Sequence, residues 1–369
     1  MLALLAGLGA PAARGADDAQ TRAQMRELFA AMQLLLPLSA DGDLAAPDER
    51  ARVTRALEAL ASHAELLAAH AGESDPARRY LGRSLASDAR NALERYREGR
   101  TDSAAFLIQQ ATENCIACHG KLRSPGDSPV ATHFVDAGVL AKLPPEERAR
   151  LQIATRQFDA AMTTLEGLFA EPSVHPSTML GPLTDYLTVA VRVKGDYDRP
   201  LPVLERFAKR QDLWLQLRAD VEQWMRDLRE LRPLRDEVPS LATARRLVEE
   251  ARSGGPFAPD ERSLVRTLVA SSILHRWLAG GGHPAAEQSE AWGLLGACEL
   301  RTGDTFWLSQ AEFYLETAIR SAPGSTPARR AYELLEAETI ESYTGAAGAD
   351  LPPALAAHLA ELRKLAEGR

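Results

Sequence analysis

Cys115, Cys118 and His119 stand in a Cys-x-x-Cys-His sequence at the end of a stretch with helical periodicity. On a helix these positions differ by three, four and one residues, so their side chains project from one side. This is the spacing at which haem c is attached: each thiol adds to a vinyl group of the haem, and the imidazole binds its iron. A chain with this sequence has to fold so that one side of the helix accepts a large, flat cofactor. We therefore predict one covalently attached haem c.

The residues upstream of the motif fit such a cofactor. Leu107, Ile108 and Ala111 continue the same side of the predicted helix toward its N-terminus. An apolar stripe of this kind is the surface against which a haem would lie.

Two other uses of the motif are weaker alternatives. A zinc site needs about four nitrogen or sulfur ligands, and the chain has only one further cysteine, Cys298, with its other histidines scattered. A thioredoxin-like redox pair follows a strand, whereas the segment before Cys115 has a helical pattern throughout. Cys298 lies among apolar residues, so we expect a buried structural thiol there.

The N-terminus predicts export. Residues 1–10 form a short apolar run, followed by small residues up to Ala16 and then by two aspartates. This pattern is typical of a secretory signal peptide, which we assign to residues 1–16 with cleavage near Gly15 or Ala16. The run is too short to span a bilayer, and no later segment is apolar enough to do so. We therefore expect a soluble periplasmic protein, the compartment in which bacterial haem c is attached.

Length and composition predict an all-α protein with more than one domain. A chain of 369 residues is long enough for two or three domains, and it is rich in Ala, Leu, Arg and Glu. The net charge of −8 argues against nucleic acid as a partner.

Four helical patterns precede Ser124-Pro125-Gly126. Their apolar positions recur at helical spacing, which predicts the inward-facing side chains. They are Met25, Leu28, Phe29, Met32, Leu35 and Leu36; Val53, Leu57, Leu60, Ala64 and Leu67; Leu81, Leu85, Ala89, Ala92 and Tyr96; and the stripe of the motif helix. Pro37, Asp41 and Gly42 are expected to end the first helix, which we place at about residues 18–36. Short connections predict an up-down-up-down four-helix bundle over residues 18–124.

This region resembles the cytochrome c-prime family and its soluble b-type relative, over about a third of the chain. In that family the haem motif also lies late in the fourth helix and continues as His-x-x-aromatic-Arg. Here Arg123 matches the arginine, whereas Leu122 replaces the aromatic residue. The resemblance implies that Arg123 lies beside the proximal imidazole and tunes it; an exposed arginine at a helix end is the alternative.

The sequence leaves two arrangements open for the sixth coordination position of the iron. The resemblance to the b-type relative makes Met25 the candidate axial ligand, and a methionine ligand favours electron transfer. An apolar, non-ligating residue in this region, as in c-prime proteins, leaves a five-coordinate iron that binds NO or CO. Met32 is expected to pack in the core, and His63 and His70 are further candidates that are better explained as partly exposed histidines.

The remainder of the chain predicts a helical scaffold. Prolines and glycines at residues 125–144 mark a linker, and helices punctuated by Pro and Gly fill residues 145–369. We expect His133 in this linker to be exposed to solvent; approach to the haem edge is the alternative. Paired helices of this kind indicate a solenoid. Residues 288–323 resemble a tetratricopeptide repeat, with its Trp-x-x-Leu-Gly opening and small and apolar positions in the second helix. The matching residues are Trp292, Leu295, Gly296, Ala311, Leu315, Ala318 and Pro323, and Glu299 replaces the usual aromatic residue.

The scaffold contains no sequence pattern of a phosphate loop, a metal-ligand pair or a catalytic nucleophile. We therefore expect a non-enzymatic periplasmic monohaem cytochrome that passes single electrons to a redox partner protein docked on the helical region. The alternatives are a gas-binding or gas-sensing haem protein and a scaffold protein with a structural haem domain. The resemblance also implies a homodimer formed through the first two helices of the bundle.

Overall fold

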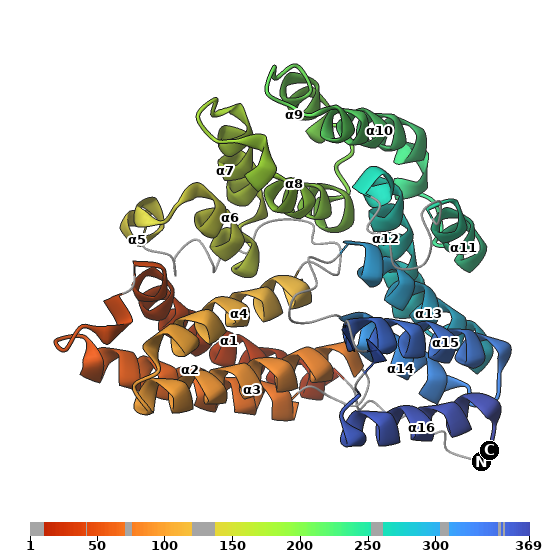
Figure 1. The fold of residues 1–369 in the computed structure, drawn as a ribbon, viewed down its shortest axis with the longest axis horizontal. Coiled ribbons are helices and arrows are strands. Elements are labelled where there is room, and N and C mark those ends of the chain that lie inside the picture. The colour runs from red at the N-terminus through yellow and green to blue at the C-terminus, as the bar shows by residue number, and fades with distance from the viewer. Residues whose placement is uncertain are drawn as a thin grey trace, which may run out of the picture. The chain divides into compact units, whose positions relative to one another are not determined.

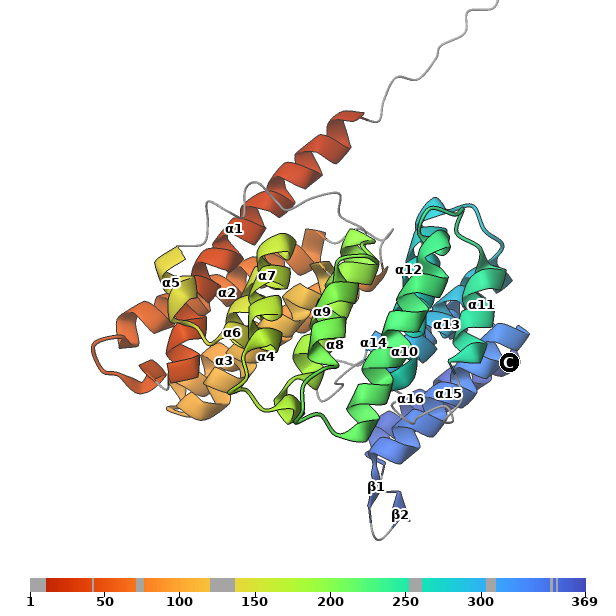
Figure 2. The ribbon, with the colours of Figure 1, turned by 90° about the horizontal axis from the view of Figure 1, so that it is seen from above.

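The computed structural model describes residues 11–41, 43–70, 76–119, 137–251, 261–302, 310–345, 348–349 and 351–369. Within these ranges the chain is helical, apart from two short strands, so the predicted all-α class is confirmed (Figure 1). The strands are β1 (Thr344–Gly345) and β2 (Gly348–Ala349), which pair antiparallel with Thr344 opposite Ala349. Figure 2 shows this pair projecting beyond the end of α15 (Thr326–Ser342).

The chain forms two compact units. The first comprises Met1–Cys118 and Pro129–Leu143, and the second comprises His119–Ser128 and Pro144–Arg369. The division falls within the last turn of the helix that carries the motif. The predicted limits of the bundle and linker, at residues 124 and 144, stay a prediction.

The first unit consists of sequential helices around an apolar core. They are α1 (Pro11–Asp41), η1 (Asp43–Ala45), α2 (Arg50–His70), α3 (Pro76–Arg97), α4 (Thr101–His119, whose last residue belongs to the second unit) and α5 (Ala137–Lys142). Helix α1 packs on α2, and α2 packs on α3. Most of the side chains predicted to face inward are buried, because the helical repeat places them on the packed faces. Met25, Phe29 and Leu107 are the exceptions, since each is only half-buried.

The limits of the first helix differ from the prediction. Helix α1 begins at Pro11 rather than near residue 18, and it continues past Pro37 to Asp41. A proline inside a helix removes one backbone hydrogen bond, so it usually marks an end. Here Leu35, Leu36 and Ser39 are buried on both sides of the proline, and the Ser39 hydroxyl donates to the Leu36 carbonyl at 2.7 Å. Packing of these turns outweighs the lost bond.

The predicted signal peptide lies mostly outside the described residues, which begin at residue 11. Export therefore stays a prediction. None of the described helices is both long enough and apolar enough to cross a bilayer.

The second unit contains the remaining helices. They are α6 (Pro145–Ala154), α7 (Phe158–Ala170), η3 (Pro176–Thr178), α8 (Leu180–Leu187), η4 (Thr188–Lys194), α9 (Pro200–Phe207), α10 (Leu215–Leu231), η5 (Arg232–Arg235), α11 (Leu241–Glu250), η6 (Glu261–Ser263), α12 (Leu264–Gly280), α13 (Ala285–Thr302), α14 (Gln310–Ser321), α15 (Thr326–Ser342) and α16 (Pro353–Glu367). Neighbours in sequence pack together: α6 on α7, α11 on α12, and α13 on α14. The core of this unit is therefore built mainly between consecutive helices.

Helices α13 and α14 are the pair predicted to resemble a tetratricopeptide repeat. Leu295, Ala311 and Leu315 are fully buried between them, and Trp292 stacks on Tyr314 with ring centroids 5.6 Å apart. Gly296 allows the close approach, because a Cβ atom there would lie 2.6 Å from Leu315 Cγ.

Glu299, where the repeat usually has an aromatic residue, makes a buried ion pair instead. Its carboxylate accepts from Arg192 Nη2 at 2.7 Å, and Arg192 also donates to the Ser271 hydroxyl. The bonds of Arg192 to Glu299 and Ser271 therefore join η4 to α13 and α12.

Candidate cofactor site at the end of helix α4

Helix α4 carries the motif on its last two turns. Ala104, Ile108 and Ala111 are fully buried one turn apart, so the helix packs through one apolar stripe. Leu107, which was predicted to belong to this stripe, is half-buried and lies at its edge. Toward the C-terminus the stripe gives way to polar and sulfur-containing side chains.

Cys115, Cys118 and His119 are all half-buried on this helix. Their offsets of three, four and one residues place them on the same side, as predicted from the sequence. The Cys115 thiol donates to the Ala111 carbonyl at 3.2 Å. All three side chains are therefore partly accessible to solvent, and the positions of their Cα atoms are set by the backbone of α4.

The His119 ring is oriented by a backbone carbonyl of the second unit, to which His119 itself belongs. Its Nδ1 lies 2.5 Å from the carbonyl oxygen of Ala154, 35 residues further along the chain. A carbonyl oxygen only accepts, so Nδ1 carries the proton. In the neutral ring Nε2 then has the free electron pair, which is the arrangement that metal-binding histidines use.

The surroundings keep the imidazole neutral. Burial is the largest influence and, with the positive charge of Arg156, lowers the pKa of His119 to about 4, while the bond to Ala154 opposes this shift. An imidazole that is neutral at pH 7 has its Nε2 electron pair available to a metal.

Burial acts in the opposite sense on the thiol of Cys115. Burial, followed by the neighbouring Cys118 and Glu113, raises the pKa of Cys115 to about 12. The group is therefore a neutral thiol at pH 7 rather than a reactive thiolate. This protonation state disfavours a thioredoxin-like redox pair, which needs a thiolate.

Polar side chains beside the cysteines lack part of their hydrogen bonding. Asn114 is 2% exposed, and its Nδ2 donates to Asp88 Oδ2 on α3 at 2.8 Å, which holds the end of α4 against α3. Burial raises the pKa of Asp88, and the bond from Asn114 opposes that shift. Within the described part of the chain, the Asn114 Oδ1 atom and the Thr112 hydroxyl are buried and have no hydrogen-bond partner. Both residues lie within three positions of Cys115 in the sequence, and a group bound there would be one way to satisfy these atoms.

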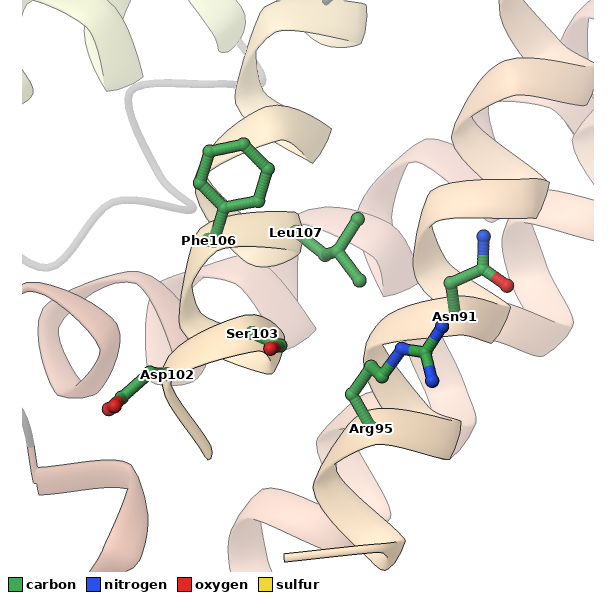
Figure 3. A pocket seen from close by; sticks show the side chains of 6 residues that line it. All are labelled: Asn91, Arg95, Asp102, Ser103, Phe106 and Leu107. Carbon is green, nitrogen blue, oxygen red and sulfur yellow. The ribbon is translucent and has the colours of Figure 1, made fainter. Parts of the chain in front are cut away.

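A groove between α3 and α4 lies away from the motif. Its volume is about 450 Å³, and Arg95, Phe106 and Leu107 are among the side chains that line it (Figure 3). Leu107 precedes Cys115 by eight residues, which is about 12 Å along a helix. The groove contains none of the motif residues, so it does not define the candidate site.

The other predicted ligands are placed on α1 and α2 of the first unit. Met25 is half-buried on α1, whereas Met32 is buried in the core, as expected for a packing residue. His63 is half-buried on α2, with its Nδ1 2.6 Å from Gln24 Oε1. Ligation by Met25 stays a prediction.

Several predicted residues lie outside the described part of the chain. They are Arg123 and His133, together with the side chain of His70. Among the residues that the structure describes, no group of three or more Cys, His, Asp or Glu side chains is arranged to hold a metal ion. Cys115, Cys118 and His119 therefore stay the site that the motif predicts, on the last two turns of α4.

Sequence reasoning missed the Ala154 carbonyl and Arg156. A backbone carbonyl carries no residue-specific signal, and its partner is distant in the chain.

Comparison with protein-family models, with curated proteins and with solved structures finds no match to this chain.

Proposed function

We propose that this protein is a monohaem c-type cytochrome that transfers single electrons. The observation that carries the proposal is the Cys-x-x-Cys-His arrangement on one side of α4, with His119 Nδ1 bonded to the Ala154 carbonyl so that Nε2 is free. When bound, the haem supplies an iron centre that alternates between the ferrous and ferric states. Cys115 and Cys118 hold it covalently, and His119 binds the iron through Nε2.

The residues around the motif fit this role. The neutral imidazole has its electron pair available, and its orientation is held by a carbonyl rather than by a mobile side chain. The apolar stripe of α4 and the orphan oxygens of Thr112 and Asn114 adjoin the attachment site. A backbone carbonyl that holds the ring in place favours a constant ligand geometry, which suits electron transfer.

The proposed architecture follows the sequence. Helices α1 to α4 form an up-down-up-down haem bundle, and the helices after residue 145 form a tetratricopeptide-like solenoid that docks a redox partner protein. The packing of α1 on α2 and of α2 on α3, and of α13 on α14, supports this arrangement. An exported, periplasmic location is part of the proposal, because haem attachment requires it in bacteria.

A five-coordinate haem that binds or senses NO or CO is the second candidate function. Ligation by Met25, which is half-buried on α1, rests on the sequence alone, and without that ligand the iron would have an open sixth position. The absorption spectrum of the reduced protein with and without CO distinguishes the two candidates, because an iron with two protein ligands forms no rapid CO adduct.

Covalent attachment is tested with the full chain produced in a host that matures c-type cytochromes. We expect the haem to remain with the polypeptide after denaturation, and we expect the Cys115→Ala, Cys118→Ala double variant to lose it. Cys298→Ala is the matched control, because this buried thiol lies on α13 and is expected to leave the pigment unchanged. A colourless wild-type chain with free thiols at residues 115 and 118 would contradict the proposal.

A further inference from the structure

Helix α6 ends in a turn that is unusual for the residue it contains. The Arg156 N–H donates to the Ile153 carbonyl at 2.9 Å, and the Gln157 N–H donates to the Gln152 carbonyl at 2.8 Å. These two bonds define a Schellman turn, in which the residue after the helix adopts the left-handed conformation. Arg156 has a φ of 61°, and it is the only non-glycine residue with a positive φ in the described ranges.

Glycine is the usual residue at this position, because a Cβ atom is sterically unfavourable there. Among the described residues, the other positive φ values all belong to glycines, including Gly195 after η4 and Gly368 after α16. An arginine is therefore conformationally costly at the end of α6. A favourable interaction of the Arg156 side chain would offset this conformational cost.

The same turn provides the acceptor for His119. Ala154 is the last residue of α6, and a helix leaves its final carbonyls without partners inside the helix. Here the Ala154 carbonyl accepts from His119 Nδ1. The carbonyl also lies at the negative end of the helix dipole, so the bond draws the ring proton toward it and makes Nε2 a stronger electron donor.

Arg156 places a positive charge at this carbonyl end, two residues beyond the acceptor. The Arg156 side chain is exposed and leaves the same turn whose Ala154 carbonyl oxygen lies 2.5 Å from His119 Nδ1, so the turn carries its charge near the ring. A strong donor nitrogen stabilises ferric iron, whereas a nearby cation stabilises the ferrous state. The hydrogen bond from His119 to Ala154 and the charge of Arg156 thus have opposite effects on the iron. Their combined effect would set the reduction potential.

We propose that the C-terminal turn of α6 is the tuning element of the iron ligand: Ala154 fixes the His119 ring, and Arg156 raises the reduction potential. Arg156 is a positioning residue in this scheme, because it acts through the turn and the imidazole. The inference rests on the proposed function, since it requires iron bound to His119.

The test measures the reduction potential of the purified holoprotein by spectroelectrochemical titration. Arg156→Asn removes the charge while keeping a residue that tolerates a positive φ. We expect a threefold to tenfold decrease in the equilibrium constant for reduction, where tenfold corresponds to about 59 mV for one electron. Arg156→Lys retains the charge and is expected to restore the wild-type potential to within twofold.

Two further variants separate the charge from other effects. Arg156→Gly removes the charge and the unfavourable Cβ atom, so its potential should decrease as in Arg156→Asn while its thermal midpoint increases. Arg226→Asn on α10 is the matched control for net charge. The Arg226 guanidinium donates to Gln223 Oε1 on its own helix, and loss of its charge should leave the potential unchanged.

The outcomes distinguish this inference from the proposed function. A haem-containing Arg156→Asn protein with the wild-type potential overturns the role of Arg156 and leaves the cytochrome assignment intact. Equal decreases in the Lys and Asn variants also overturn it, because they assign the effect to backbone geometry. A wild-type chain without attached haem overturns both.

Discussion

At the scale of single residues, the environment of His119 shows how burial and one hydrogen bond select a chemical state. The ring is neutral at pH 7 because burial and the charge of Arg156 disfavour its cationic form. The Ala154 carbonyl then selects the tautomer, since it bonds only to a protonated Nδ1. These two influences together leave the electron pair of Nε2 available to a metal.

The lowered pKa of His119 predicts a pH dependence of stability for the chain before haem attachment. The folded pKa of about 4 lies below the ordinary value of 6.5, so the unfolded chain binds the proton more tightly. The contribution is therefore fully present above pH 6.5 and is lost as the pH falls toward 4. Between pH 7 and pH 5 we expect a loss of about 1 kcal/mol in the free energy of unfolding, which is smaller than the full linkage value because the ring is partly exposed to solvent.

Urea denaturation of the unloaded full chain at the two pH values measures this loss. His119→Asn is the control, because a side chain that does not titrate removes the dependence assigned to this residue. If wild type and His119→Asn lose the same stability between pH 7 and pH 5, the assignment to His119 is wrong.

At the scale of helices, close packing depends on residues without large side chains. Gly296 on α13 faces Leu315 on α14, whereas Gly293 on the same helix has only ordinary van der Waals space around it. The two glycines are otherwise similar in setting, since each lies inside one α-helix. The difference arises from the partner helix and not from the local sequence.

The two glycines predict opposite effects of the same substitution. Gly296→Ala introduces a methyl group that overlaps the buried Leu315 side chain, and such overpacking destabilises by about 1–3 kcal/mol. Gly293→Ala improves helix propensity without a clash and is expected to be neutral or stabilising by up to about 1 kcal/mol. Thermal and urea unfolding of both variants checks the comparison, and equal effects would show that α13 and α14 do not approach as described.

At the scale of the whole molecule, buried charges connect elements that are distant in sequence. Arg192 and Glu299 lie 107 residues apart, and their side chains are 9% and 12% exposed. Ser271 on α12 accepts two further hydrogen bonds from the same guanidinium group. This network joins η4, α12 and α13 within the second unit.

Breaking this network should cost far more than breaking a surface pair. Glu299→Ala leaves the Arg192 charge buried without its carboxylate, for which we expect a loss of about 3–5 kcal/mol in the free energy of unfolding. Glu290→Ala is the control on the same helix, because its partner Arg245 is 42% exposed and the expected loss is about 1 kcal/mol or less. Comparable losses in urea unfolding would contradict the structural role of the buried pair.

Much of the first unit could be predicted from helical periodicity, because burial on a helix follows the repeat of 3.6 residues. The inward positions of α2 and α3 are buried as expected, from Val53 to Tyr96. The predicted end of α1 at Pro37 was wrong, because local propensity carries no information on how the turns around the proline pack. Met25 and Phe29 also follow the repeat but are only half-buried, because the neighbours of a helix decide how wide its buried face is.

By itself, the sequence determined the helical class and the placement of Cys115, Cys118 and His119 on one side of a helix, because both depend only on the periodicity of the chain. Tertiary structure alone decided that Ala154 accepts from His119 and that Arg156 acts on the same ring. Tertiary structure also decided that Glu299, which stands where the repeat has an aromatic residue, forms an ion pair with Arg192. These features depend on contacts between distant segments and on backbone atoms, which no local pattern of residues specifies.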